Sequence, residues 1–359
     1  MDSYKKIVVK LGTNVLTREN GALDITAISH LVDQMAALKQ RNIEVILVSS
    51  GAVGAGRSAI QLSKDLNKVV QRQVYSAIGQ IHLLNLYNSL FSNHQIFCAQ
   101  VLATKEDFRD RTHYLNMKNC FQALLRDNVI PIVNENDVIS VNELMFTDND
   151  ELAGLIAALM NADALMILST VDGILDGHPD QPESKTIPII DPDDKAIQSF
   201  IMPSKSSFGR GGMHTKFSIS KKVSGLGITT FIANGKRSNV LLDIVKGDFV
   251  GTKILAKKGT SNIKKWMAFN DLSEKGIVYI NEGAAKVLTS AEKVSSLLPI
   301  GITKIEGTFQ KGDIIKIVNE SGKSIGIGVA QYGVEKAQSF IGQKSKKALV
   351  HYDYLLIDN

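Results

Sequence analysis

The chain has 359 residues, of which 44% are apolar and 21% charged, and its net charge is +5. This length predicts about two domains, and no apolar run approaches the roughly 18 residues of a membrane helix, so we expect no membrane span. The chain has two cysteines, Cys98 and Cys120, which exclude a disulfide scaffold and, with no signal segment at the start, predict a cytoplasmic protein.

The first 250 residues alternate short apolar runs with helical patterns. Apolar residues at helical spacing predict helices over 25–38, with Asp24 as N-cap, and over 148–161. Such alternation predicts an α/β fold, in which helices sandwich a mostly parallel central sheet and ligands bind beyond the carboxyl ends of the strands. The predicted strands are short and rich in β-branched residues, and they cover 7–9, 45–48, 130–133, 165–168 and 231–233.

Two further segments differ from this pattern. Residues 175–210 are polar and rich in turn residues, and we interpret them as an excursion or lid with partial mobility. After Trp266 the runs become short and glycine-punctuated, which predicts a small β-barrel-like domain with strands at 276–280, 312–318 and 325–329. The predicted organisation is an α/β domain over 1–258, a linker over 259–270 and a β domain over 271–359.

The positive charge is concentrated in the last third of the chain. Residues 251–359 contain 16 lysines, no arginine and 10 acidic residues, a balance of +6. Such an excess can mark a nucleic-acid surface. A face solvated by lysines explains a modest excess equally well, so nucleic-acid binding stays one of two readings.

Three segments combine glycines with lysines or helix starts. Lys10 and Gly12 follow the first predicted strand, the small residues 49–56 follow the second, and the loop 209–216 leads into a helix that begins with Lys216 in its first turn. Glycines let the backbone N–H groups approach an anion, and lysines offset phosphoryl charge. The plainer explanations are a surface turn at Lys10 and close helix–sheet packing at 49–56. Together the segments favour phosphoryl transfer without a covalent nucleophile.

Carboxylates and amides gather at two further positions, 134–137 and 148–150. Asn and Asp are common in turns and at helix N-caps, which explains each residue taken singly. Taken together, these residues could hold the ammonium group of an amino acid, orient catalytic lysines or bind Mg²⁺. The histidines lack metal-ligand spacing, and no cysteine–histidine metal pattern is present, so we predict no dedicated protein metal site.

These motifs, in this order and spacing, resemble the amino-acid kinase family, and most closely its glutamate 5-kinases, over essentially the whole chain. The C-terminal domain resembles a PUA domain, a type that binds RNA in other proteins. Three places depart from the usual pattern, at Arg210, at Thr147 and in the segment 169–175. The matching segments are 8–13, 48–56, 131–137, 148–150 and 211–216.

The resemblance implies an ATP-dependent kinase that phosphorylates the side-chain carboxylate of L-glutamate, the first step of proline biosynthesis. Lys10 and Lys216 are implied to contact the transferring phosphoryl group, with Asp148 between them and holding them in position. Mg²⁺ is implied to bridge the phosphates, proline to act as feedback inhibitor, and the chain to form a homodimer or tetramer. The implied glutamate-binding residues are Ser50, Asn134, Asp137, Asn149 and Asp150. The implied ATP-binding residues are Lys10, Gly12, Gly51, Ser169, Thr170, Gly211, Gly212, Met213, His214, Thr215 and Lys216.

Two alternatives remain. The first is another member of the same family, acting on acetylglutamate, aspartate or uridylate, although the segments 134–137 and 148–150 suit a free amino acid better. The second is a regulatory protein that binds RNA through its C-terminal domain, although Lys10, Asp148 and Lys216 would then have no role.

Overall fold

The computed structural model describes residues 4–63, 66–140, 146, 148–177, 183–194, 212–257, 274–290 and 295–357. It divides into two compact units, Met1–Gly259 and Thr260–Asn359. The predicted linker at 259–270 lies outside the described residues. Each unit has a hydrophobic core of its own.

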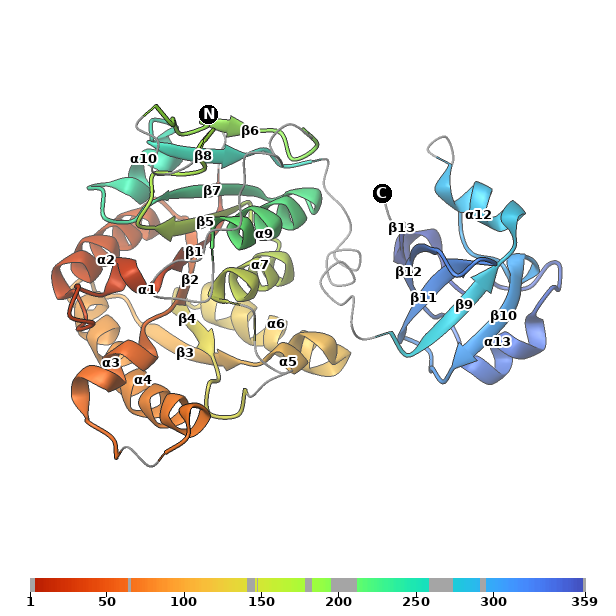
Figure 1. The fold of residues 1–359 in the computed structure, drawn as a ribbon, viewed down its shortest axis with the longest axis horizontal. Helices are drawn as coiled ribbons and strands as arrows, with labels where there is room; N and C mark the ends of the chain where they lie inside the picture. The colour runs from red at the N-terminus through yellow and green to blue at the C-terminus, as the bar shows by residue number, and fades with distance from the viewer. Residues whose placement is uncertain are drawn as a thin grey trace. The chain divides into compact units, whose positions relative to one another are not determined.

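The N-terminal unit is built on an eight-stranded sheet with the order β3-β4-β2-β1-β5-β7-β8-β6 (Figure 1). The strands from β3 to β7 in this order all pair in parallel, whereas β8 pairs antiparallel with β7. The predicted mostly parallel sheet is therefore confirmed. The strands are β1 (Lys6–Leu11), β2 (Glu44–Ser49), β3 (Cys98–Ala103), β4 (Ile130–Glu135), β5 (Ala164–Ser169), β6 (Ile189–Ile190), β7 (Thr229–Asn234) and β8 (Gly251–Ile254).

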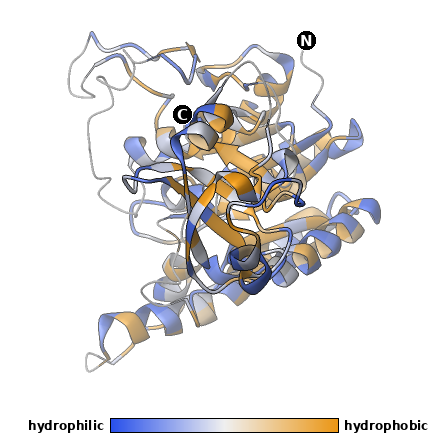
Figure 2. Ribbon diagram, turned by 90° about the vertical axis from the view of Figure 1, so that its right-hand side faces the viewer, coloured by the Kyte–Doolittle hydropathy of each residue, from blue (hydrophilic) through white to orange (hydrophobic). Residues whose placement is uncertain are grey.

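Helices cover both faces of this sheet. On one face, α2, α4 and α10 pack with the strands into one apolar core, and on the other α6, α7 and α9 pack against β4, β1 and β7 (Figure 1). Figure 2 shows hydrophobic residues concentrated in the strands. The helices are α1 (Thr13–Leu16), α2 (Ile25–Gln40), α3 (Ala52–Ala59), α4 (Lys68–Ser92), α5 (Lys105–Arg109), α6 (Arg111–Arg126), α7 (Asn149–Met160), α9 (Met213–Gly225) and α10 (Val240–Lys246).

Side-chain caps fix where the two predicted helices begin. The Asp24 carboxylate accepts a hydrogen bond from the Ala27 N–H at the start of α2, as predicted. The Asp148 carboxylate accepts from the N–H groups of Asp150 and Glu151 at the start of α7. From Leu152 to Met160 every residue of α7 is buried, so this helix is held between the sheet and its neighbours.

The predicted excursion at 175–210 is described in part. Residues Leu175 and Thr186 form an isolated antiparallel bridge, and β6 pairs in parallel with β8 at the edge of the sheet. This part of the excursion therefore extends the sheet. The remainder, at 178–182 and 195–210, lies outside the described residues.

The C-terminal unit contains a five-stranded mixed sheet with the order β10-β9-β11-β12-β13. The three strands predicted from the sequence correspond to β9, β11 and β12, and helices α12 (Glu282–Thr289) and α13 (Val334–Phe340) contribute to the same core. Its strands are β9 (Gly276–Ile280), β10 (Ile302–Gly307), β11 (Ile314–Asn319), β12 (Ser324–Val329) and β13 (Leu355–Ile357).

Candidate active site

The candidate site lies where the parallel strands β1, β2, β4, β5 and β7 end, here called the carboxyl edge of the sheet. Parallel pairing places Leu11 beside Ser49 and Leu168, and Val48 beside Val133. The loops that follow these strands therefore meet at one edge. Helices α3, α7 and α9 begin at the site segments predicted from the sequence, so each directs backbone N–H groups there.

Two lysines meet on one carboxylate at this edge. The Lys10 Nζ of β1 lies 2.5 Å from Asp150 Oδ1, and the Lys216 Nζ of α9 lies 2.7 Å from Asp150 Oδ2. Asp150 is fully buried, and only 5% of Lys10 and 7% of Lys216 is exposed. The two adjacent ammonium groups lower the pKa of the Asp150 carboxyl against the opposing effect of burial. Two positive charges are thus fixed side by side.

The prediction that Asp148 lies between the lysines is wrong. Its Oδ1 is used by the first turn of α7, where it accepts from the N–H groups of Asp150 and Glu151 at 2.9 and 3.1 Å. A helix start has N–H groups without partners inside the helix, and Asp148 satisfies two of them. Two residues further on, Asp150 projects from the first turn toward both lysines.

The second oxygen of Asp148 is buried and has no hydrogen-bond partner among the described residues. Burial, and after it the charge of Asp150, raise the pKa of the Asp148 carboxyl to about 6. Among the residues that the structure describes, no group of three acidic, histidine or cysteine side chains could hold a metal ion. A single orphan carboxylate oxygen fits Mg²⁺, which takes few protein ligands and keeps its phosphate and water ligands.

A network of amides lies next to the lysines. The Asn149 Nδ2 donates to Ser50 Oγ at 2.9 Å and to Asn134 Oδ1 at 3.1 Å. The Asn134 Nδ2 in turn donates to Gln80 Oε1 at 2.9 Å. Three of the predicted glutamate-binding residues, from β4, from α7 and from the position directly after β2, are therefore brought into direct contact.

Two predicted glutamate-binding residues remain. Asp150 pairs with both lysines, and Asp137 belongs to an acidic cluster in the loop that follows β4. Its carboxylate forms an ion pair with Arg72 and accepts from Ser76 Oγ at 2.8 Å. Arg72 also donates to Glu135 Oε2 at 3.1 Å. Burial raises the pKa of the Glu135 carboxyl to about 7. A cavity of about 370 Å³ borders Ser76, Gln80, Glu135 and Asp137.

The sequence interpretation missed Arg72, Ser76 and Gln80, which all lie on α4. Polar residues at intervals of four predict one helix face, and this signal is present in the sequence. The signal is weak because many exposed helices carry polar residues at this spacing. Only the contacts of the three side chains with the loop 134–137 show that they belong to the candidate site.

The predicted nucleotide-binding residues lie in three loops of this edge. Gly12 donates its N–H to the Leu168 carbonyl at 3.1 Å, and a Cβ there would lie 3.7 Å from Lys10 Nζ. Gly51 begins α3 with φ +102°, a conformation that favours glycine. Residues 212–215 form the start of α9, with His214 exposed, whereas Gly211, Arg210 and Thr147 lie outside the described residues.

Ser169 and Thr170 follow β5, and a neighbouring ion pair fixes the loop that they begin. The Ser169 carbonyl accepts from Gly235 N–H at 2.8 Å. Arg237 makes two hydrogen bonds, of 2.8 and 2.7 Å, to the Asp172 carboxylate. The loops after β5 and β7 are thereby tied together, and in the described part of the chain no side-chain hydrogen bond joins Ser169 or Thr170 to either lysine.

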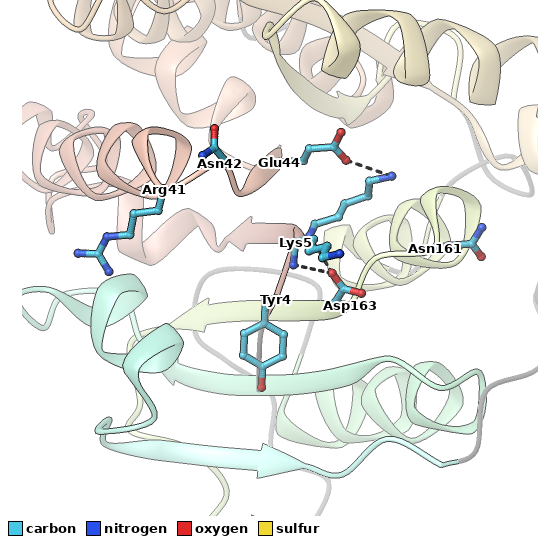
Figure 3. A pocket seen from close by; sticks show the side chains of 8 residues that line it. Tyr4, Lys5, Arg41, Asn42, Glu44, Asn161 and Asp163 are labelled. Carbon is cyan, nitrogen blue, oxygen red and sulfur yellow. Dashed lines mark hydrogen bonds and ion pairs between the residues drawn. The ribbon is translucent and has the colours of Figure 1, made fainter. Parts of the chain in front are cut away.

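A second cavity, of about 700 Å³, lies at the opposite end of the strands (Figure 3). Its carboxylates already have partners: Glu44 pairs with Lys6 Nζ at 3.1 Å, and Asp163 accepts the backbone N–H groups of Lys5 and Lys6 at 2.7 and 2.8 Å. These contacts tie the start of β1 to its neighbours. Parallel sheets bind ligands at the other end, so we assign this cavity no part in the site.

The N-terminal unit is an α/β domain with a ligand site of two buried lysines at the carboxyl edge of a mostly parallel sheet, an arrangement suited to binding phosphate groups. Residues 5–234 match the amino acid kinase family, and residues 276–352 match the PUA domain. The chain belongs to the amino acid kinase family. No described helix is long and apolar enough to cross a membrane.

Curated relatives match almost from end to end. The glutamate 5-kinase of Chlorobaculum tepidum is 52% identical over 99% of this chain and 98% of its own length. That of Bacteroides thetaiotaomicron is 51% identical over 99% of both chains. Among solved structures, the carbamate kinase from Giardia lamblia bound to AMP-PNP covers 72% of this chain and 100% of its own, with 20% identity and a TM-score of 0.53. This last likeness concerns the fold alone.

Proposed function

We propose that this chain transfers the γ-phosphoryl group of ATP to the side-chain carboxylate of L-glutamate, giving ADP and L-glutamyl 5-phosphate, the first step of proline biosynthesis. The observation that carries the proposal is the pair of lysines, Lys10 and Lys216, held 2.5 and 2.7 Å from the two oxygens of Asp150. The full-length similarity to glutamate 5-kinases supports the choice of acceptor.

The reaction needs charge neutralisation more than a base. A carboxylate is ionised at neutral pH and attacks phosphorus without losing a proton. It must approach a triphosphate that repels it, and fixed ammonium groups offset that repulsion. Lys10 and Lys216 supply them, and Asp150 sets their direction. A Cβ at Gly12 would lie 3.7 Å from Lys10 Nζ, so glycine keeps a side chain out of the space beside that ammonium group.

The acceptor end is assigned to the amide network and the acidic loop. Asp137 offers a carboxylate to the α-ammonium group of glutamate, and Asn134, Asn149 and Ser50 offer polar atoms to the rest of the amino acid. Gly51, Ser169, Thr170 and the segment 211–216 are assigned to ATP. A bound Mg²⁺ would neutralise part of the phosphate charge, and Asp148 is the residue that would hold it, directly or through its water ligands.

A hydroxylamine-trapping assay tests the activity. Acyl phosphates form coloured hydroxamates, so the purified chain with Mg-ATP is offered L-glutamate, N-acetyl-L-glutamate and L-aspartate, and UMP is followed by ADP release. We expect a signal with free glutamate alone, lost in Lys10→Ala and Lys216→Ala. Signal with another acceptor would overturn the substrate assignment, and a silent panel would overturn the activity.

Three further properties belong to the same proposal. Proline inhibits the reaction, and the chain assembles as a homodimer or tetramer, as the resemblance to glutamate 5-kinases implies. The enzyme works in the cytoplasm, which the two free cysteines, Cys98 and Cys120, support. Proline titration in the same assay and light scattering of the purified chain test the first two properties.

A further inference from the structure

One face of α4 carries three polar side chains that all contact the loop of the presumed acceptor site. Arg72, Ser76 and Gln80 are spaced by four residues, so they lie above one another on the helix. Here the loop 134–137 is called the acceptor loop. Ser76 Oγ donates to Asp137 Oδ2 at 2.8 Å, Gln80 Oε1 accepts from Asn134 Nδ2 at 2.9 Å, and Arg72 forms ion pairs with Glu135 and Asp137.

These contacts fix the orientation of two groups of the acceptor loop, the Asp137 carboxylate and the Asn134 amide. Both Asp137 oxygens have a partner on α4, one from Arg72 and one from Ser76, which fixes the plane of the carboxylate. Gln80 holds the amide of Asn134, and Asn134 Oδ1 accepts from Asn149. Ser76 and Gln80 are 4% and 8% exposed, so these hydrogen bonds form away from bulk water and hold their geometry.

The same helix also reaches the strand end that precedes Ser50. Tyr87 of α4 is fully buried, and its hydroxyl lies 2.8 Å from Ser49 Oγ. Burial raises the pKa of the Tyr87 hydroxyl, so it stays protonated. One helix face therefore contacts both β2 and the acceptor loop.

Close packing against α3 fixes where α4 lies. A Cβ on Gly79 would overlap the carbonyl oxygen of Ala52, and one on Gly56 would overlap the carbonyl oxygen of Tyr75. The backbones of the two helices are thus in contact. Because α3 begins at Gly51, the position of α4 is tied to the loop assigned to the phosphates.

We propose that Arg72, Ser76 and Gln80 are positioning residues that orient Asp137 and Asn134 for the α-ammonium end of the acceptor, and so set the preference for an amino acid over a plain dicarboxylate. This inference rests on the proposed function. The three side chains act through the acceptor loop. Lys10 and Lys216 pair with Asp150 instead, so we expect substitution of the three side chains to change the binding of ATP little.

Steady-state kinetics of full-length variants test this. Ser76→Ala removes one hydrogen bond to a charged group with little change in volume, and Gln80→Leu removes the acceptor for Asn134. We expect each to raise the KM for glutamate about tenfold or more, with the KM for ATP and kcat within about twofold of wild type. Ser89→Ala, on the exposed part of the same helix, serves as the matched control.

Glutarate is glutamate without its ammonium group. Its inhibition constant distinguishes a loss of contacts to the ammonium group from a general distortion of the acceptor site. Its inhibition constant should stay within about twofold in Ser76→Ala, while the KM for glutamate rises. Arg72→Lys should retain more of the glutamate preference over glutarate than Arg72→Met, because the lysine keeps the charge beside Asp137.

The outcomes separate the two proposals. A wild-type chain that does not phosphorylate glutamate overturns the proposed function itself. A wild-type chain that is active, with variants whose glutamate KM is unchanged or whose glutamate and glutarate constants rise together, overturns the positioning role alone.

Discussion

The Asp150 carboxylate pairs with both lysines of the candidate site. Its two oxygens each face one lysine, from β1 and from α9, and it is fully buried. Without this carboxylate, two ammonium groups so close together would repel each other and turn away. The negative charge of Asp150 therefore keeps Lys10 and Lys216 close together, although their positive charges repel each other.

Substitutions at 148 and 150 should separate the roles of the two aspartates. We expect Asp150→Asn to lower kcat roughly 10²–10³-fold, because the lysines lose the charge that orients them. Asp148→Asn keeps an oxygen for the helix N-terminus, since Asn caps helices as well as Asp does, so kcat should fall much less. The trapping assay with saturating ATP and glutamate measures both. Equal losses, or the reverse order, would contradict the assignment.

We expect the protonation of Glu135 to make the free energy of unfolding depend on pH. Burial raises the pKa of its carboxyl from 4.5 to about 7, so between these values the folded chain keeps a proton that the unfolded chain has released. The stabilising contribution is complete below about pH 4.5 and is lost as pH rises through 7. We expect the free energy of unfolding of wild type to fall between pH 5 and 8 relative to Glu135→Gln. Urea unfolding at pH 5, 6, 7 and 8 measures the difference, and a constant difference would contradict the shift.

The sequence predicted that residues 148–150 belong to the candidate site, but not which of the two aspartates pairs with the lysines. Asp148 and Asp150 stand in one turn, and both suit a helix N-terminus. The choice depends on where Lys10 and Lys216 point, which is decided by strands and helices far away in the chain. The sequence likewise did not show that Glu135 is buried, because its partner Arg72 lies on α4, far away in the chain.

At the level of elements, the crossing of α3 and α4 depends on two glycines. We expect Gly79→Ala to lower the free energy of unfolding by about 1–3 kcal/mol or more, because its Cβ would overlap the Ala52 carbonyl. Gly54→Ala is the matched control on α3, since its Cβ would lie 3.6 Å from the nearest atom, and it should be neutral or stabilise by up to about 1 kcal/mol. Urea unfolding compares the two, and equal effects would contradict close backbone contact.

Helices with apolar residues at a clear helical spacing and strands with a short apolar run were predicted well. The strands β1, β2, β4, β5 and β7, and the helices α2 and α7, all correspond to patterns in the sequence. The helix α4 was not predicted, although it has 25 residues. Its apolar residues are not confined to one face, since Leu83 is buried and Ile81 is 63% exposed. The apolar residues therefore do not show a regular helical spacing in the sequence. Edge strands such as β6 are too short to show any alternation.

At the level of the whole molecule, two separate cores predict two folding units. The core of the N-terminal unit surrounds the eight-stranded sheet, and that of the C-terminal unit joins its five strands to α12 and α13. We expect the fragments 1–259 and 260–359 each to unfold cooperatively in urea, with midpoints close to those of two transitions in the full chain. A fragment that is unfolded in buffer would show that its core needs the other unit.

The site is assembled from distant parts of the chain, since Lys10 lies on the first strand and Lys216 on α9. Ribosomes deliver a protein from its N-terminus, so every element that carries Lys10 and Asp150 is made before the second lysine exists. A nascent chain that ends before α9 lacks Lys216, which is the partner of Asp150 Oδ2 in the full chain. The pair of ammonium groups to which we assign phosphoryl transfer is therefore complete only once α9 has been synthesised.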